Sequence, residues 1–486
     1  MRILQVSAEL FPLLKTGGLA DVAGALPLAL LAAGQDVRVL LPGFPAIVAG
    51  VVDSRPVAEF TAPWGERVRL LFGRIPIDGA GAIPAYVIDA PWLYDRPGNP
   101  YEDTSRQPYG DNHRRFALLG WAAAQLARDL DPHWRPELVH AHDWHAGLAP
   151  AYLAFAQPDG RPRVGSVFTV HNLAYQGLFA PWHFSELGLP PAAFSVNGLE
   201  FHGQMSFMKG GLCFADRITT VSPTYSHEIQ TPEQGFGLDG LLRSRSQVLS
   251  GILNAVDDQV WNPATDTLIP HRYDARRMPG KARCKAALQE ELGLAPQPDA
   301  PLFVVVSRLT EQKGLRLVLE GLDALVANGG QLALLGSGDA DLEAAFRQRA
   351  ADAPRSVGVT LGYSEPLAHR LFAAGDVTLV PSLFEPCGLT QMYGLKYGSL
   401  PLVHRVGGLA DTVVDASLED MASGHATGFT FDAFDAAGYA RAVRRAFALY
   451  RRPTDWRAVR ANAMSRPADW DTAAARYLDV YAEAIG

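Results

Sequence analysis

The sequence has few cysteines, no excess of positive charge and no long hydrophobic run, and each absence excludes a class of protein. Its three cysteines, Cys213, Cys284 and Cys387, have neither disulfide nor metal-site spacing, which favours a reducing cytoplasm. The net charge of −8 argues against attraction to nucleic acid or an anionic membrane surface. Residues 25–33 fall far short of the ~20 apolar residues that span a bilayer, and residues 3–6 are too short for a secretion signal.

What remains is the composition of a large folded protein. With 48% hydrophobic and 19% charged residues, the chain is unlike a disordered one. Its 486 residues exceed the ~250 to 300 that one hydrophobic core organises, so we expect two domains.

Both halves show alternating strand and helix patterns, which are typical of doubly wound α/β domains with parallel sheets. Pro-rich stretches near residues 263–279 interrupt the pattern, so we predict domains at 1–250 and 251–464, with a helix at about 465–486 that returns to the first domain. The expected strands are residues 2–7, 37–41, 68–72, 85–88, 138–141 and 164–170 in the first half, and 302–306, 332–335, 357–361, 377–380 and 400–403 in the second. The expected helices include residues 19–33, 112–130 and a tail at 456–481.

Ligands of parallel sheets bind beyond the carboxyl ends of the strands, so motifs at strand ends matter most. Lys15, Gly17 and Gly18 follow the first strand and open the first helix, offering a cation and a close backbone approach to phosphate or sugar. The alternative is a tight turn beside a solvated lysine.

Two segments of the second half have the same placement. Arg308 and Lys313 follow its first strand and could clamp a diphosphate, although they could also be two surface cations. A donor that stabilises charge on a departing phosphate contributes about 2.7 to 4 kcal/mol to catalysis. Glu385 follows the strand at 377–380, and a helix that begins near Gly388 would favour phosphate, whereas Cys387 could be a small buried residue.

Histidines and carboxylates near the strand ends of the first half raise the question of a metal site. His140, His142, Asp143 and His145 straddle a strand end, where alternating side chains point to opposite faces, so we expect no metal there and expect Asp143 to face the ligand. His171 ends the next strand and should also face the ligand, although a lone histidine is more often structural. The two DxD triplets, at residues 129–131 and 339–341, lie at helix ends and are interpreted as caps and solvated charges.

Together these segments make the chain resemble bacterial glycogen synthases and plant starch synthases of the ADP-glucose type, from residue 2 nearly to the end. The segments that carry the resemblance are residues 15–19 (KTGGL), 93–101 (LYDRPGNPY), 140–148 (HAHDWHAGL), 170–177 (VHNLAYQG), 251–254 (GILN), 308–314 (RLTEQKG) and 384–391 (FEPCGLTQ).

The resemblance implies the GT-B fold, with two Rossmann-like domains that face each other across a deep cleft. It also implies transfer of glucose, with retained anomeric configuration, from ADP-glucose to the nonreducing 4-hydroxyl of an α-1,4-glucan, with no metal or other cofactor. Arg308 and Lys313 would replace the charge of the metal, His171 would hold the donor glucose near its 6-hydroxyl, and Glu385 would contact the sugar and its developing positive charge.

Further positions match the family's donor site, and one matches its acceptor side. The wider retaining superfamily has paired glutamates eight positions apart, which here are Glu385 and Tyr393, as suits this family. The donor-side residues are Lys15, Gly18, Asp143, Asn254, Tyr363 as an adenine-stacking candidate, Cys387, Gly388, Leu389 and Thr390, and the acceptor-side candidate is Tyr94.

Three other functions compete with this interpretation. The same fold could use UDP-glucose or a sucrose-type acceptor, or the chain could be a noncatalytic glucan-binding relative. A phosphorylase would need a lysine that holds pyridoxal phosphate, and Lys281, Lys285 and Lys396 lack a recognisable context for it. The expected partners are therefore ADP-glucose and glucan chains, and no particular oligomeric state is predicted.

Overall fold

The computed structural model describes residues 1–77, 79–156 and 160–486 of the chain. They form two compact units: unit 1 comprises Met1–Asn254 together with Trp470–Gly486, and unit 2 comprises Ala255–Asp469. The boundaries lie a few residues later than the predicted ones at 250 and 464.

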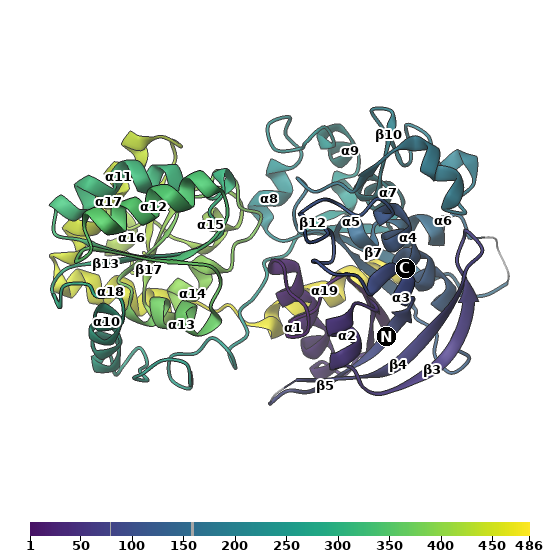
Figure 1. Cartoon of the computed structure of the whole chain (residues 1–486), viewed down its shortest axis with the longest axis horizontal. Helices are drawn as coiled ribbons and strands as arrows, with labels where there is room; N and C mark the ends of the chain where they lie inside the picture. The colour runs from purple at the N-terminus through teal and green to yellow at the C-terminus, as the bar shows by residue number, and fades with distance from the viewer. Residues whose placement is uncertain (78, 157–159) are drawn as a thin grey trace. The chain divides into compact units, whose positions relative to one another are not determined.

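Unit 1 is built on a nine-stranded sheet in the order β12-β11-β7-β6-β1-β2-β5-β4-β3 (Figure 1). The seven strands from β12 to β5 pair in parallel, whereas β4 pairs antiparallel with both β5 and β3. The strands are β1 (Arg2–Val6), β2 (Asp36–Pro42), β3 (Val52–Thr61), β4 (Arg67–Ile77), β5 (Gly81–Asp89), β6 (Leu138–His142), β7 (Gly165–Val170), β11 (Arg217–Thr220) and β12 (Leu249–Gly251).

Helices and a small sheet complete unit 1. Most parallel strands are buried along nearly their whole length, which requires covering on both faces. The small sheet contains β8 (Leu178–Phe179), β9 (Glu200–Phe201) and β10 (Gln204–Ser206). The helices are α1 (Gly18–Ala32), α2 (Pro45–Gly50), α3 (Pro91–Tyr94), α4 (Asn112–Leu126), α5 (Asp143–Ala146), α6 (Leu148–Ala154), α7 (Phe207–Phe214), α8 (Pro223–Glu228), α9 (Asp239–Ser244) and α19 (Trp470–Ile485), with 3-10 turns η1 (Pro181–Glu186), η2 (Pro191–Ala193) and η3 (Ser246–Val248).

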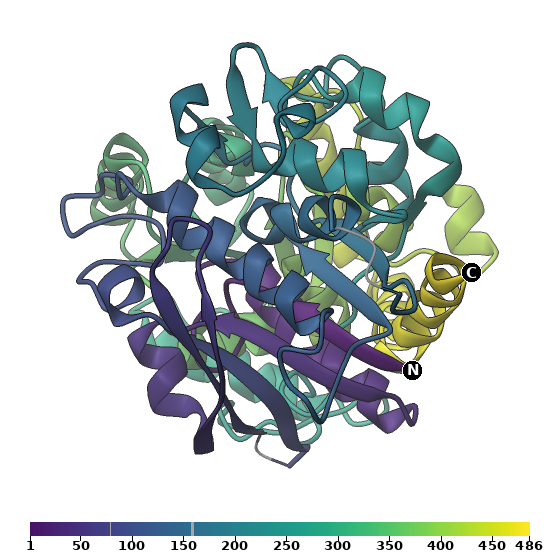
Figure 2. The ribbon, with the colours of Figure 1, turned by 90° about the vertical axis from the view of Figure 1, so that its right-hand side faces the viewer.

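Helix α19, at the end of the chain, belongs to unit 1. It packs on α1 and β7, where Tyr477 and Tyr481 are fully buried in a core shared with Leu26 and Val167. The yellow helix lies beside the purple N-terminal segment in both views of the ribbon (Figures 1 and 2). The helical tail predicted at 456–481 is in fact two helices, α18 (Pro453–Met464) and α19, because Pro467 lies in the connection between them.

Unit 2 contains a six-stranded parallel sheet in the order β15-β14-β13-β16-β17-β18, which is the Rossmann strand order. The strands are β13 (Leu302–Val306), β14 (Gln331–Gly336), β15 (Val357–Leu361), β16 (Val377–Val380), β17 (Leu400–His404) and β18 (Phe429–Phe431). The five strands predicted in this half are confirmed to within one residue.

Helices cover both faces of this sheet, as Figure 1 shows, and the buried apolar residues of the strands form one core with them. The helices are α10 (Pro279–Glu291), α11 (Leu315–Ala327), α12 (Ala340–Asp352), α13 (Glu365–Ala374), α14 (Thr390–Tyr397), α15 (Gly407–Thr412), α16 (Leu418–Ala422), α17 (Ala436–Tyr450) and α18, with the 3-10 turn η4 (Glu311–Lys313). Among the helices described, none combines the length and the apolar character needed to cross a membrane.

The strand order of each sheet reverses at one point, and this locates the loops that can bind a ligand. In unit 1, β2 lies on one side of β1, and β6, followed outward by β7, β11 and β12, lies on the other; in unit 2 the reversal lies between β13 and β16. Ligands bind at such switch points, beyond the carboxyl ends of the strands. We therefore expect ligands to bind at the loops after β1, β6, β7, β13 and β16.

Candidate functional site

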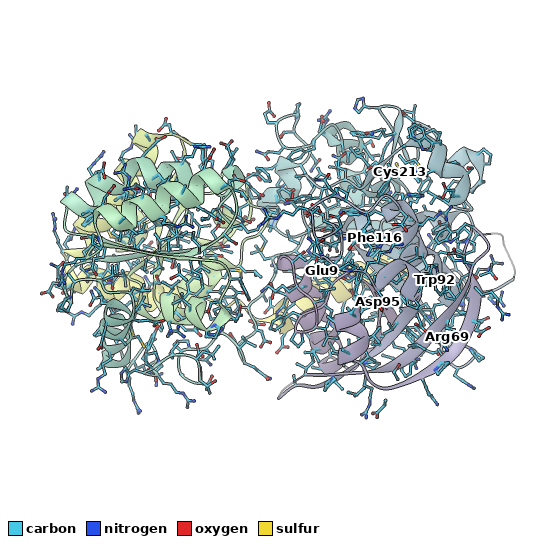
Figure 3. All side chains as sticks on the ribbon, in the orientation of Figure 1. Glu9, Arg69, Trp92, Asp95, Phe116 and Cys213 are labelled. Atoms are coloured by element: carbon cyan, nitrogen blue, oxygen red, sulfur yellow. The ribbon has the colours of Figure 1, made fainter. Side chains whose placement is uncertain are left out.

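The loop after β1 carries the KTGGL motif and is held by a buried carboxylate. Glu9, 2% exposed, accepts hydrogen bonds from the Thr16 backbone N–H at 2.6 Å and from the Tyr101 hydroxyl (Figure 3 labels Glu9). Lys15 Nζ lies 2.9 Å from Asp21 Oδ1, and Gly18 begins α1 with open space where a Cβ would stand. The sequence prediction missed Glu9, although an acid so soon after an apolar strand was a usable signal.

Asp143 fixes the backbone of His171. It has a left-handed backbone (φ +57°) at the end of β6, and its Oδ1 accepts the His171 N–H at 2.8 Å and that of Asn172 at 3.4 Å. Burial raises the pKa of Asp143 to about 7, against the lowering effect of these two backbone hydrogen bonds. Asp143 and His171, both predicted site residues, are thus in contact.

The His171 ring is held as firmly as its backbone. Its Nε2 lies 2.9 Å from Nδ1 of His142, and only 9% of the residue is exposed. Burial lowers the pKa of His171 to about 3, so the ring is neutral at physiological pH.

The four side chains considered as a metal site do not converge. His140 and His142 lie on the same face of β6 with ring centroids 4.1 Å apart, because they are two residues apart on a strand. His140 contacts Tyr481 and Thr169. Asp143 instead points its Oδ1 at the next loop, and His145 stacks on Tyr101.

Tyr94, the acceptor-side candidate, lies in the core of unit 1. Its residue is 1% exposed, and its hydroxyl donates to the Arg115 carbonyl at 2.7 Å. The ring therefore offers a ligand neither a face nor a hydrogen bond, and we do not retain it as a contact.

An open hollow of about 520 Å³ lies on unit 1 beside the loop that follows His171. Tyr175 is 52% exposed there, and apolar side chains dominate the remaining wall. Exposed aromatic rings in a hollow are suited to the apolar faces of sugars. The lining residues are Trp144, Ala174, Tyr175, Gln176, Gly177, Leu178, Phe201 and Phe236.

At the switch point of unit 2, Lys313 and Glu385 form a largely buried ion pair. Lys313 Nζ lies 2.6 Å from Glu385 Oε2, which also accepts from Ser382 Oγ at 2.9 Å. The two charged side chains are 19% and 9% exposed. Two predicted catalytic residues from different loops therefore meet at the carboxyl ends of β13 and β16.

The turn after Glu385 is shaped by close backbone contacts. Gly388 adopts φ +75°, and a Cβ on Gly408 would lie 2.2 Å from the carbonyl oxygen of Cys387. Cys387 is buried, while Leu389 precedes α14 and Thr390 begins it, two residues later than the predicted start. Tight turns of this kind expose backbone N–H groups to an anion.

The other predicted residues of unit 2 are more exposed. Arg308 is exposed to solvent after β13, and Tyr363 is 72% exposed after β15, where its hydroxyl contacts Glu365. Tyr393, eight positions after Glu385, is buried with its ring 3.8 Å from that of Trp261. It stabilises the core and leaves Glu385 as the acid of this turn.

Asn254, the last residue of the long segment of unit 1, follows β12. It is 7% exposed, and its Oδ1 has no hydrogen-bond partner within the described part of the chain. A buried amide oxygen without a partner is costly, so this atom is suited to accept from a ligand.

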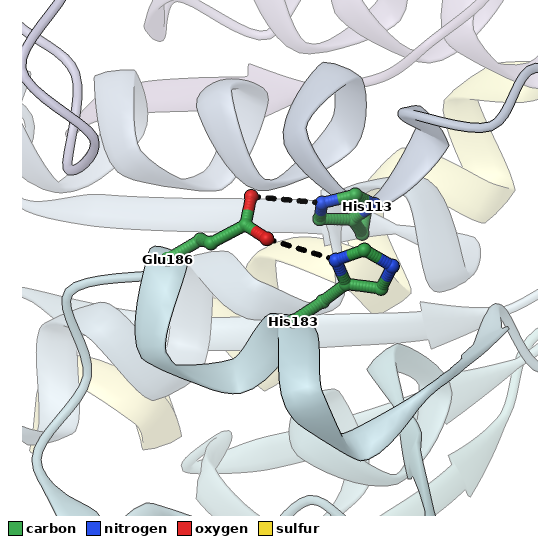
Figure 4. A group of neighbouring side chains, drawn as sticks. All are labelled: His113, His183 and Glu186. Carbon is green, nitrogen blue, oxygen red and sulfur yellow. Dashed lines mark hydrogen bonds and ion pairs between the residues drawn. The ribbon is translucent and has the colours of Figure 1, made fainter.

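Of the described side chains, His113, His183 and Glu186 come close enough together to hold a metal ion (Figure 4). His113 Nε2 and His183 Nδ1 contact different oxygens of Glu186, at 3.1 and 2.8 Å, and the two rings stack with centroids 3.8 Å apart. Arg114 Nε also donates to Glu186 Oε2, at 2.5 Å. Both ring nitrogens that could bind a metal already contact this carboxylate, which Arg114 also engages, so we assign the group a structural role.

The two Rossmann-like units and their switch-point residues define a glycosyltransferase of the GT-B fold. Residues 2–244 match the family profile described as "Starch synthase catalytic domain", and residues 292–460 match "Glycosyl transferases group 1". The chain belongs to the glycogen and starch synthase family of glycosyltransferases, and it is an enzyme of that family.

Full-length relatives support this assignment. The chain is 77% identical to a protein named Glycogen synthase from Variovorax paradoxus (strain S110), over 100% of this chain and 99% of the relative. It is 61% identical to another of that name from Leptothrix cholodnii, with 99% of each covered.

Two solved structures also resemble the chain. The catalytic domain of Starch Synthase IV from Arabidopsis thaliana, bound to ADP and acarbose, matches with a TM-score of 0.88, 31% identity and coverage of 100% and 99%. Sucrose-phosphate synthase from Thermosynechococcus elongatus matches with a TM-score of 0.59 and 16% identity, over 99% and 98%, which shows a common fold.

Proposed function

We propose that this chain is a glycogen-forming enzyme that transfers glucose from ADP-glucose to the nonreducing 4-hydroxyl of an α-1,4-glucan, with retention. The observation that carries the proposal is the Lys313–Glu385 pair beside the tight turn at Gly388. It places a cation and a carboxylate beside a tight turn at one switch point, as a sugar diphosphate requires. The names of the full-length relatives and the ADP bound to Starch Synthase IV agree with this substrate class.

Arg308 and Lys313 bind the diphosphate, Glu385 contacts the glucose as positive charge grows on it, and His171 holds a sugar hydroxyl. Tyr363 stacks on the adenine, because its exposed ring is available for a base. The remaining donor contacts are Lys15, Gly18, Asp143, Asn254, Cys387, Gly388, Leu389 and Thr390.

Retention follows if the acceptor attacks from the side that the leaving group departs from. The bond from the anomeric carbon to the phosphate oxygen breaks, the bond to the acceptor oxygen forms, and the acceptor proton passes to the leaving phosphate. No protein nucleophile is needed, and the charge on phosphate is met by Arg308 and Lys313 without a metal ion.

We place the acceptor in the hollow lined by Tyr175 and its neighbours, instead of at Tyr94. Its exposed aromatic ring can stack on glucose units and its open shape admits a chain. The hollow is lined by residues 174–178, which follow His171 in the sequence, so we expect the acceptor end to lie near the sugar that His171 holds.

Two further expectations complete the proposal. We expect no pyridoxal phosphate, in keeping with the contacts of the three lysines considered for it: Lys281 Nζ donates to three backbone carbonyls, Lys285 Nζ pairs with Asp376 at 2.7 Å, and Lys396 Nζ pairs with Asp258. We also propose a cytoplasmic location, since the cysteines described are all unpaired thiols.

The test is incorporation of labelled glucose into glycogen by the purified chain, from ADP-glucose and, separately, from UDP-glucose. We expect ADP-glucose to be the better donor, and an excess of UDP-glucose activity would overturn the choice of base. Absence of incorporation from either donor, with glycogen still bound, would indicate the noncatalytic glucan-binding alternative.

A further inference from the structure

A chain of buried hydrogen bonds joins Gln5 on β1 to His171 at the end of β7. Gln5 Oε1 lies 2.6 Å from His142 Nε2, and His142 Nδ1 lies 2.9 Å from His171 Nε2. The three residues are 2%, 1% and 9% exposed. Because bulk water hardly reaches these three side chains, their polar atoms must find hydrogen-bond partners in the protein.

The other end of the Gln5 amide is held by helix α19. Gln5 Nε2 donates to the Tyr481 hydroxyl at 2.9 Å, and that oxygen lies 2.7 Å from His140 Nδ1. His140 Nε2 lies in turn 2.6 Å from Thr169 Oγ1. With Gln5 Nε2 donating to it, the Tyr481 hydroxyl gives its own hydrogen to His140, and the Gln5 amide oxygen faces His142.

This direction determines where the hydrogens of both histidines lie. An amide oxygen only accepts, so His142 Nε2 must carry a hydrogen. Burial lowers the pKa of His142, so its ring is neutral and its Nδ1 is a bare acceptor. His171 Nε2 must therefore donate, and its own Nδ1 is left without a hydrogen.

We propose that Gln5, His142 and Tyr481 are positioning residues that hold His171 in its Nε2–H tautomer, with Nδ1 as a hydrogen-bond acceptor. Asp143 separately fixes the His171 backbone, so both the direction of the ring and its proton are set. An accepting nitrogen binds a hydroxyl and rejects a phosphate oxygen, which only accepts. Resting on the proposed function, this assigns His171 to a sugar hydroxyl of the donor and makes it a determinant of sugar specificity.

The proton assignment can be tested without any activity. In full-length protein carrying 15N-labelled histidine, long-range 1H–15N correlations identify the protonated ring nitrogen of each histidine, and His171→Gln assigns the signal. We expect the Nε2–H tautomer for His171 in the wild type. The Nδ1–H tautomer would mean that the Gln5 amide has the opposite direction, and it would overturn the proposal.

Two variants at one position test whether Gln5 sets the tautomer. Gln5→Glu, measured at a pH where its buried carboxyl is protonated, keeps a neutral group that accepts from His142 and should preserve the Nε2–H form of His171. Gln5→Leu removes the accepting oxygen. Because one hydrogen bond is lost, the ratio of Nε2–H to Nδ1–H forms should fall by about fivefold in Gln5→Leu. An unchanged ratio would overturn the role of Gln5.

Tyr481→Phe removes only the hydroxyl that accepts from Gln5, so its effect on His171 is transmitted through the hydrogen bonds of Gln5 and His142. It should shift the tautomer ratio in the same direction and lower kcat with ADP-glucose by about threefold to tenfold, with a smaller change in KM. Tyr152→Phe is the matched control, since it removes another buried hydroxyl of unit 1, bonded to the Leu187 carbonyl at 2.5 Å, and should change neither. Equal effects of Tyr481→Phe and Tyr152→Phe would overturn the positioning role. If the wild-type protein shows the Nε2–H tautomer of His171 but transfers no glucose, only the proposed function is contradicted.

Discussion

Lys313 Nζ lies 2.6 Å from Glu385 Oε2, so the cation proposed for the phosphate is bound to the carboxylate proposed for the sugar. A sugar diphosphate that binds there must share Lys313 with Glu385. The pair keeps both charges compensated before the donor arrives, which reduces the cost of holding them in a largely buried place.

Lys313→Ala should reduce kcat/KM for ADP-glucose at least tenfold, about 1.4 kcal/mol, because the phosphate charge is left uncompensated. It should also destabilise unit 2, since Glu385 stays buried without its partner. Lys313→Ala combined with Glu385→Gln should recover stability in urea unfolding while activity stays low. Lys396→Ala, which removes the lysine of an ion pair with Asp258 in the same unit, is the control and should leave kcat/KM unchanged.

Arg308→Ala separates phosphate binding from stability. Its side chain is exposed, so we expect an unchanged melting temperature together with a loss of at least tenfold in kcat/KM for ADP-glucose. Steady-state kinetics and a thermal melt measure the two quantities. Unchanged kinetics would contradict the clamp.

Gly18→Ala tests whether a ligand approaches the start of α1. A Cβ there meets nothing within 4 Å, so the fold should tolerate it. If the donor packs against the Gly18 backbone, KM for ADP-glucose should rise several-fold at an unchanged melting temperature. Gly110→Ala, at another open glycine of unit 1, should change neither value, and an unaltered KM in Gly18→Ala would remove Gly18 from the donor site.

The raised pKa of Asp143, about 7, predicts how stability depends on pH. Between the unfolded value near 3.9 and about 7, the folded state binds more protons at this group than the unfolded state does, so its contribution to stability falls as pH rises. Asp143→Asn keeps an oxygen for the His171 N–H and tolerates the left-handed backbone. The unfolding midpoint of Asp143→Asn should therefore rise relative to that of the wild type between pH 5 and pH 7.5. A constant difference between the two midpoints would show that Asp143 titrates below this range.

Tyr363→Ala should weaken donor binding without affecting the fold, because the ring is 72% exposed. Stacking on a base contributes about 1 to 3 kcal/mol, so KM for ADP-glucose should rise at least about fivefold. Tyr363→Phe keeps the ring and should behave as the wild type, which separates stacking from the contact of the hydroxyl with Glu365.

Much of the fold was readable from the sequence because buried parallel strands are short, continuous apolar runs. Residues 302–306 and 377–380 are examples, and the glycines and charges after them mark the ligand-binding ends. The edge strand β3 was missed, since most of its residues are exposed, half of them are polar, and it is defined only by pairing with β4. Proline inside residues 465–469 was a signal for the break between α18 and α19 that the prediction did not use.

The supporting residues of the site were less predictable than the residues they hold. Gln5 reaches His142 only through the register of β1 against β6, and Tyr481 is 476 positions from Gln5. Tyr94 lies in a segment that resembles the family, yet its ring is buried against Arg115. Local motifs indicate which loops carry function, but the distribution of hydrogen bonds among them depends on the tertiary structure.

The return of α19 to unit 1 also has a consequence for synthesis on the ribosome. Unit 1 receives its last helix only after all of unit 2, Ala255–Asp469, has been translated. At about 5 to 20 residues per second, this delay lasts roughly 10 to 40 s. While unit 2 is being translated, the apolar surface of α1 and β7 that α19 will cover stays exposed. His140 and Gln5 also lack their hydrogen-bond partner Tyr481 during this time. A nascent unit 1 is thus a natural client for a chaperone until the end of the chain emerges.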